Sequence, residues 1–106
     1  MKWLAQVIFS LLLSGLASAG QPLPERQAEL RYLLEQDCGS CHGLTLKGGL
    51  GPALTPAALA GKPPEFLQYT ILYGRLGTAM PPWRGILNED ESRWLAERLL
   101  AGEMQP

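Results

Sequence analysis

The feature that most constrains this chain is the five-residue motif Cys38-Gly39-Ser40-Cys41-His42. On a helix, residues three and four positions apart share a face, so two thiols and an imidazole would project together. This spacing is the attachment pattern of haem c, in which the thiols add to the two vinyl groups and the imidazole becomes an axial ligand of the iron. We therefore predict one covalent haem c held by Cys38, Cys41 and His42.

Two other kinds of site use closely spaced cysteines. A thioredoxin-like dithiol requires a strand leading into the motif within an alternating pattern of strands and helices, and no such pattern precedes Cys38. A structural zinc site requires about four Cys or His ligands. The whole chain contains two cysteines and one histidine. Both alternatives therefore fit the sequence less well than haem attachment does.

The start of the chain has the pattern of a secretory signal peptide. Lys2 supplies a positive charge, an apolar run extends from Trp3 to Leu13, and Ala17-Ser18-Ala19 is a small-residue cleavage pattern. The apolar run is shorter than the roughly 20 residues that span a bilayer. We predict a cleaved signal peptide at residues 1–19 and a single domain at residues 20–106, which is exported and does not span the membrane after processing.

The mature domain is small and nearly neutral. The chain has nine basic and ten acidic residues, so losing Lys2 leaves eight against ten, a formal charge of −2. This charge excludes the basic footprint of a nucleic-acid-binding protein. A domain of this size usually needs an internal staple, because its core alone buries too little apolar surface. The haem would be that staple.

The remaining pattern predicts helices separated by glycine-rich and proline-rich loops, with no strand. A first helix is expected from about Pro24 to Gly43, including the motif, and a single capped turn from Thr55 to Gly61. A longer helix is expected from Pro63 to Gly74 and a last one from Asn88 to Gly102. The expected apolar faces are Phe66, Leu67, Thr70, Ile71 and Tyr73 on the third segment, and Trp94, Leu95 and Leu99 on the last. The predicted fold is all-α, with three to four helices packed around one haem.

The second axial ligand is predicted by elimination. The chain has one histidine, so a thioether is the natural second donor. Met1 leaves with the signal peptide, and Met104 follows the last helix in a tail that is expected to fray. Met80 remains, in a stiff loop that contains Pro81 and Pro82. An iron held by His42 and Met80 has no open position for a substrate, which predicts electron transfer and no enzyme activity.

Three segments together resemble class I cytochromes c: the motif at 38–42, then Gly51-Pro52-Ala53-Leu54, then Met80-Pro81-Pro82-Trp83. The stretch from Gly74 to Trp83 is similar to that of the small periplasmic cytochromes encoded with cytochrome cd-type nitrite reductase in denitrifying bacteria. The resemblance covers about Leu23 to Leu100. It implies a monomeric periplasmic domain with redox proteins as partners, foremost that reductase.

The resemblance also implies that the Pro52 carbonyl accepts a hydrogen bond from the unliganded ring nitrogen of His42. It implies a right-angle crossing of the first and last helices. The usual small and aromatic contact residues are replaced here by Leu30, Leu33, Arg98 and Leu99, with Trp94 as a possible substitute. Arg75 and Trp83 are candidate partners of the haem propionates, through the guanidinium and the indole N–H.

Three functions remain open at this point. The first is a periplasmic electron carrier that serves dissimilatory nitrite reductase. The second is an assembly protein that supplies electrons while the haem d of that enzyme matures. The third is a haem sensor or enzyme, which would require Met80 to be off the iron.

Overall fold

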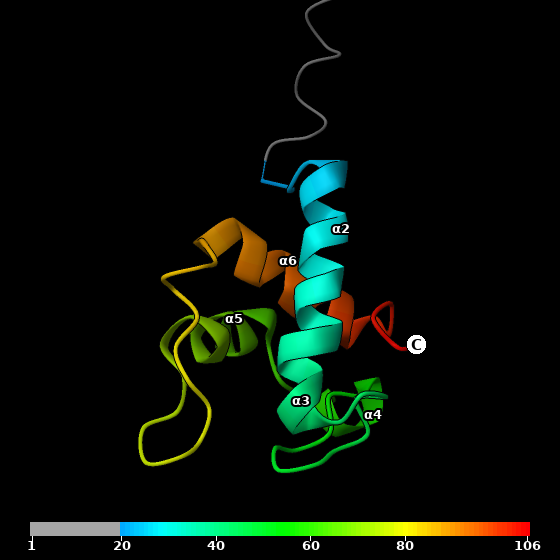
Figure 1. Cartoon of the computed structure of the whole chain (residues 1–106), viewed down its shortest axis with the longest axis vertical. Helices are drawn as coiled ribbons and strands as arrows, with labels where there is room; N and C mark the ends of the chain where they lie inside the picture. Colours follow the sequence, from blue (N-terminus) through cyan, green and yellow to red (C-terminus); the bar gives the residue numbers. More distant parts are fainter. Residues whose placement is uncertain (1–19) are drawn as a thin grey trace, which may run out of the picture.

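The computed structural model describes residues 20–106, so the proposed signal peptide lies outside the described residues. Helices and loops make up this part of the chain, which confirms the predicted all-α class (Figure 1). No helix within it has the length and apolar content that crossing a bilayer requires. The elements are α2 (Pro24–Leu33), the π-helical turn η1 (Leu34–Cys38), α3 (Gly39–His42), α4 (Pro56–Leu59), α5 (Pro64–Tyr73) and α6 (Glu89–Leu100).

Helices α2, η1 and α3 form one continuous rod that carries the motif at its end (Figure 1). Pro24 occupies the first turn, where its missing N–H costs nothing, and Glu25 complements the helix dipole there. Gly43 ends the rod with a φ of +92°, a conformation that glycine adopts without strain. The predicted bounds of the first helix are confirmed. The π-helical turn inside it was not predicted.

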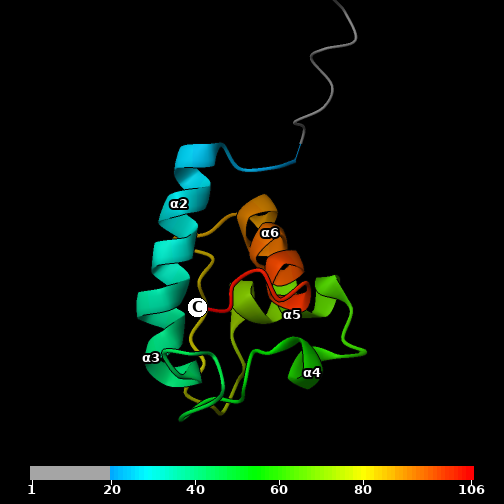
Figure 2. The same ribbon diagram turned by 90° about the vertical axis from the view of Figure 1, so that its right-hand side faces the viewer.

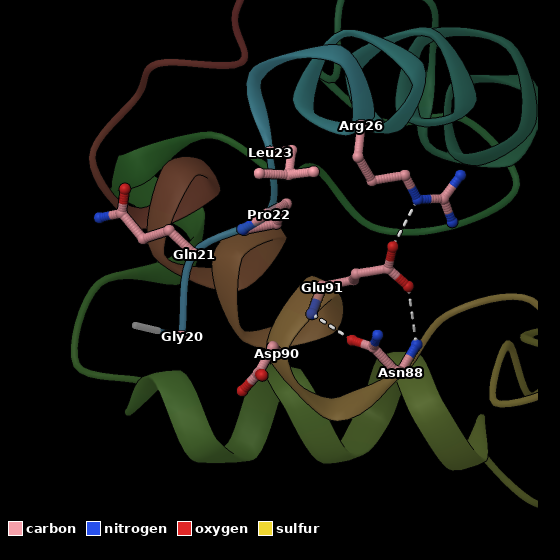
Figure 3. A pocket seen from close by; sticks show the side chains of 8 residues that line it. All are labelled: Gly20, Gln21, Pro22, Leu23, Arg26, Asn88, Asp90 and Glu91. Atoms are coloured by element: carbon pink, nitrogen blue, oxygen red, sulfur yellow. Dashed lines mark hydrogen bonds and ion pairs between the residues drawn. The ribbon is translucent and has the colours of Figure 1, made fainter. Parts of the chain in front are cut away.

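Helix α6 begins with a complete capping box. The Asn88 side chain accepts a hydrogen bond from the backbone N–H of Glu91 at 2.8 Å, and the Glu91 carboxylate accepts one from the backbone N–H of Asn88 at 3.0 Å. The same carboxylate receives a hydrogen bond from Arg26 of α2 (Figure 3). Glu91 therefore accepts a hydrogen bond from the backbone N–H at the N-cap of α6 and links this helix to α2. These residues also line a pocket of about 310 Å³ beside the first described residues, Gly20 to Leu23.

Helices α4 and α5 have the predicted caps, but the face that α5 buries differs from the prediction. The Thr55 hydroxyl accepts a hydrogen bond from Ala58 N at 3.2 Å, and α5 ends at Gly74 with a φ of +68°. Leu67 and Leu72 are buried, whereas Phe66 is 48% and Tyr73 44% exposed. The prediction for Phe66 and Tyr73 was wrong, because these rings lie beyond the strip of α5 that packs against α6.

The core lies where α2 meets α6: Figure 1 shows α2 crossing in front of α6, and Figure 2 shows the two helices beside each other. Leu30 is fully buried there, and Leu99 is 4% exposed. Trp94 is also buried, and the guanidinium groups of Arg31 and Arg98 lie 5.5 Å and 5.9 Å from its ring centroid. Trp94 therefore supplies the aromatic contact between the helices. The buried cluster consists of Leu30, Leu34, Leu46, Leu59, Leu67, Leu87, Trp94, Leu95, Ala96, Leu99 and Met104.

Met104 is part of this core, so the prediction of a frayed tail was wrong. Its side chain is 6% exposed. A guanidinium nitrogen of Arg31 lies 3.4 Å from the Met104 sulfur and donates to the backbone carbonyl of Glu103 at 3.1 Å. Gly102, with a φ of +75°, turns the chain after α6 and directs Met104 back to the core. A contact between residues so distant in sequence leaves no local pattern.

Candidate functional site

The motif residues lie at the junction between the rod and the core. Cys38, Cys41 and His42 are each half-buried, and Cys38 packs against the core cluster. The Ser40 hydroxyl donates to the Asp37 carbonyl at 2.7 Å, which holds the turn between the cysteines. The structure therefore presents both thiols and the imidazole from one short stretch of helix.

The π-helical turn η1 immediately precedes the motif. The backbone N–H of Gly39 donates to the Leu34 carbonyl five residues earlier, so this turn is wider than an α-helical one. Leu34 is buried and Cys38 packs against the same core, so both ends of the turn lie on the inner side of the rod. Turns of this kind are rare and frequently occur at functional sites. No residue in the stretch Leu34–Cys38 signals the turn.

The imidazole of His42 is fixed by the loop that follows it. Its Nδ1 lies 2.7 Å from the Pro52 carbonyl oxygen, which is the contact that the resemblance implies. Because a carbonyl can only accept, Nδ1 carries the proton and Nε2 has its lone pair free for a metal. The loop is tied back by Gly48 N donating to the His42 carbonyl and Gly51 N to the Cys41 carbonyl, both at 2.8 Å.

Gly51 makes this close approach possible. A Cβ added to Gly51 would lie 2.9 Å from both Nδ1 and Cε1 of His42, which is closer than real Cβ atoms come to other heavy atoms. Only glycine lets the backbone lie against the ring in this way. Of the Gly51-Pro52 pair, only Pro52 had a predicted role from the sequence pattern.

Met80 lies in the loop between α5 and α6, which reaches the same end of the molecule as α3 in Figures 1 and 2. Its side chain is half-buried. The Met80 carbonyl accepts from Arg75 N at 3.2 Å, and Met80 N donates to the Thr78 hydroxyl at 3.3 Å. The loop therefore forms a closed turn that holds Met80 at its exit.

The two candidate propionate partners have different surroundings. Arg75 is exposed at the start of the Met80 loop. Trp83 is half-buried and packs against the core, and its backbone N–H donates to the Ile71 carbonyl at 3.0 Å. Trp83 is therefore held by α5, whereas Arg75 projects into solvent.

The protonation of Cys38 bears on the dithiol alternative. Burial raises the pKa of the Cys38 thiol to about 11, and the neighbouring Asp37 carboxylate and Cys41 thiol act in the same direction. A redox-active dithiol needs a thiol whose pKa is lowered, usually by a positive neighbour or a helix N-terminus. The helix that leads into the motif, in place of a strand, also argues against a thioredoxin-like site.

These residues fit a covalent haem. The donor set combines two thiols at attachment spacing, an imidazole with a free Nε2, and a thioether from a separate loop. The glycine that lets the backbone cradle the imidazole is an independent sign of the same site, because a fixed ring matters for a ligand more than for a packing residue.

Comparison with known proteins gives the same assignment. The model of the family described as cytochrome C oxidase, cbb3-type, subunit III matches residues 25–97. A cytochrome c55X of Pseudomonas aeruginosa is 59% identical, over 98% of this chain and 87% of that protein. The dihydro-heme d1 dehydrogenase of the same organism is 33% identical over 91% of this chain, which spans 21% of that much longer protein.

A solved structure agrees with the sequence relatives. The structure of a c-type cytochrome NirC has a TM-score of 0.79 and 62% identity, and the match covers 80% of this chain and all of that one. Family, relatives and structure therefore agree on a domain that carries covalent haem c and transfers electrons. The chain belongs to the family of cbb3-type subunit III-like cytochrome c domains, as a small mono-haem member of the c55X and NirC type.

Proposed function

We propose that residues 20–106 are a periplasmic electron carrier that delivers electrons to cytochrome cd-type nitrite reductase, with His42 and Met80 as the two iron ligands. The observation that carries this proposal is the His42 ring, whose Nδ1 is bonded to the Pro52 carbonyl and whose Nε2 is free. A haem c supplies one-electron redox chemistry. The chain fixes the imidazole, offers one thioether from a stiff loop and contains no second histidine.

Each residue has a defined part in this proposal. Cys38 and Cys41 form the thioether links, and the Pro52 carbonyl orients the imidazole and increases its basicity. Trp83, held by α5, and Arg75, exposed at the loop, serve the propionates. The choice of nitrite reductase as the partner rests on the similarity to the c-type cytochrome NirC and on the sequence from Gly74 to Trp83.

Stopped-flow mixing of the reduced carrier with oxidised nitrite reductase tests the partner. Reoxidation of the carrier should be fast and should saturate with reductase concentration. An otherwise identical mixture with a reductase that lacks its haem d should show transfer only to the remaining haem. Transfer too slow to support turnover would contradict the carrier role.

A second function is favoured by a specific comparison. The chain aligns over 91% of its length with part of a dihydro-heme d1 dehydrogenase, at 33% identity. This favours an assembly role in which the carrier exchanges electrons with a protein that matures haem d. Rapid exchange with such a dehydrogenase, together with slow transfer to the finished reductase, would select this function. A sensor or enzyme would instead require an iron position that carbon monoxide can enter.

Export is part of the proposal. Cleavage after Ala19 would make Gly20 the first residue, and haem would be attached after transport. Intact mass of the secreted protein should equal residues 20–106 plus one haem. A species that retains residues 1–19, or that loses its haem to acidic acetone, would contradict this processing.

A further inference from the structure

A groove between α5 and the start of α6 has features that haem binding does not explain. It has a volume of about 300 Å³ and contains the buried Leu72 as an apolar floor. The side-chain amide of Gln68 donates to the Glu89 carbonyl at 2.8 Å and ties the two helices together at this point. The lining residues are Glu65, Gln68, Tyr69, Leu72, Tyr73 and Glu89.

The wall of the groove on α5 is aromatic and exposed. Tyr69 and Tyr73 lie one turn apart, with ring centroids 4.7 Å from each other and planes tilted by 43°. They are 63% and 44% exposed, and the 48% exposed Phe66 extends the same face. Contiguous exposed aromatic surface on a small domain marks a contact site.

The charges that line the groove are negative. Its two charged residues are Glu65 and Glu89. The Glu65 carboxylate also forms an ion pair with the guanidinium of Arg93 of α6 at 3.2 Å. The guanidinium of Arg84, outside the lining, lies 5.7 Å from the centroid of the Tyr73 ring. One ring of the tyrosine pair therefore already has a cation of the same chain near it. Tyrosine faces and carboxylates are the two groups that together bind a positively charged side chain.

The groove is connected to the Met80 loop through the backbone. Arg84 N donates to the Leu72 carbonyl at 3.1 Å, and Trp83 N donates to the Ile71 carbonyl at 3.0 Å. The last turn of α5, which carries Leu72 and Tyr73, therefore also anchors the segment that follows Met80 in the sequence. A molecule bound in the groove would lie beside the methionine side of the site.

We propose that this groove docks an arginine or lysine side chain from a basic surface loop of the redox partner. The cation lies against Tyr69, and the Glu89 carboxylate pairs with it. That the partner is a redox protein rests on the proposed function, whereas the groove and its preference for a cation rest on the geometry of α5 and α6. The contact places the partner next to the Met80 loop.

The test is an NMR titration of the haem-loaded mature protein with a short peptide that contains two arginines. The matching peptide with two citrullines has the same shape without the charge. Saturable shifts should concentrate at Tyr69, Tyr73 and Glu89 with the arginine peptide and be absent with the citrulline peptide. Tyr69→Ala and E89Q should each weaken binding by about five-fold, as loss of one cation–π contact or one charge pair predicts.

Matched variants separate the groove from general attraction. Tyr32→Ala removes a tyrosine of α2 that is 66% exposed and lies outside the groove, so it should leave binding unchanged. Tyr69→Phe keeps the ring and should retain most of the affinity. Equal affinity in Tyr69→Ala and Tyr32→Ala, shifts spread over all exposed carboxylates, or no shift at all would overturn the proposal.

The iron ligation is read out separately. In Tyr69→Ala the methionine-to-iron absorption of the oxidised protein should be the same as in the unchanged chain. If that absorption is absent from the unchanged chain, the proposed ligation fails while the peptide titration still decides the groove.

Discussion

Gly74 and Met80 lie in direct backbone contact. A Cβ added to Gly74 would come within 2.6 Å of the Met80 carbonyl oxygen and 2.8 Å of the Pro81 carbonyl carbon. The end of α5 therefore accepts the returning loop only because residue 74 has no side chain. The position at which α5 ends therefore affects where the proposed thioether ligand, Met80, lies.

Gly74→Ala should displace the Met80 loop. The expected result is loss of part of the methionine-to-iron absorption, a lower reduction potential and measurable carbon monoxide binding. Gly77→Ala is the matched control, because Gly77 has a similar φ of +76° with nothing within 4 Å of an added Cβ. It should cost about 1 kcal/mol of stability through backbone strain and leave ligation intact. Identical spectra for the two variants would contradict the steric role of Gly74.

Gly51→Ala should disturb the imidazole of His42, the other proposed iron ligand. The added methyl would force the His42 ring away from the Pro52 carbonyl, weaken that hydrogen bond and make the ring less basic. The reduction potential should rise, because a less basic ligand stabilises the oxidised iron less. Potentiometry measures this, with Gly85→Ala as control, since an added Cβ there has nothing within 4 Å. An unchanged potential in Gly51→Ala would count against the orienting role of the loop.

The two methionines of the described chain should respond differently to replacement. Met80→Ala should open the iron to carbon monoxide and lower the potential with little loss of stability. Met104→Ala should lower the free energy of unfolding by about 2 to 5 kcal/mol, as for other buried methionines, and leave the spectrum unchanged. Absorption spectra with and without carbon monoxide, together with denaturant unfolding, distinguish the two. Carbon monoxide binding by the unchanged reduced protein at neutral pH would remove Met80 from the proposed ligand set.

The Arg26 and Glu91 pair should make stability depend on pH. The hydrogen bond from Arg26 lowers the pKa of the Glu91 carboxyl below its usual value, with a smaller contribution from the Asn88 backbone. A group with a lowered pKa stabilises the fold above its unfolded pKa, about 4.3, and this contribution is lost as pH falls through the folded value.

Glu91→Gln is the variant that measures this contribution. It keeps an acceptor for the capping box and removes the charge, so it should cost about 1 to 2 kcal/mol at pH 7 and little below pH 3. Glu97→Gln removes the carboxylate of a more exposed ion pair with Arg93, so its effect on stability should be much smaller. A loss for Glu91→Gln that is the same at pH 3 and pH 7 would show that the charge is not responsible.

The helix ends were predictable because they depend on local chemistry. Pro24 and Pro64 lack a backbone N–H that the first turn does not use, and Gly43 and Gly74 adopt positive φ values. The Asn88 cap follows from the same local rules. These features belong to single residues and their nearest neighbours.

The features that were missed depend on tertiary contacts. The π-helical turn at Leu34–Cys38 has no sequence signal of its own, and both of its ends pack on the core. The burial of Met104 requires Arg31 from α2, and the exposure of Tyr73 depends on how far α6 covers α5. A hydrophobic pattern alone does not give the position of the covering helix.

Burial of Met104 has a consequence for how the haem-bearing chain reaches its native state. Under the proposed ligation, an unfolded haem-bearing chain would have two thioethers, Met80 and Met104, able to compete for the same iron position. In the folded chain the Met104 sulfur is buried 3.4 Å from a guanidinium nitrogen of Arg31, so it would no longer be available to the iron. A chain in which Met104 held the iron would have to release it before the core could close, which would add a ligand-exchange step to folding.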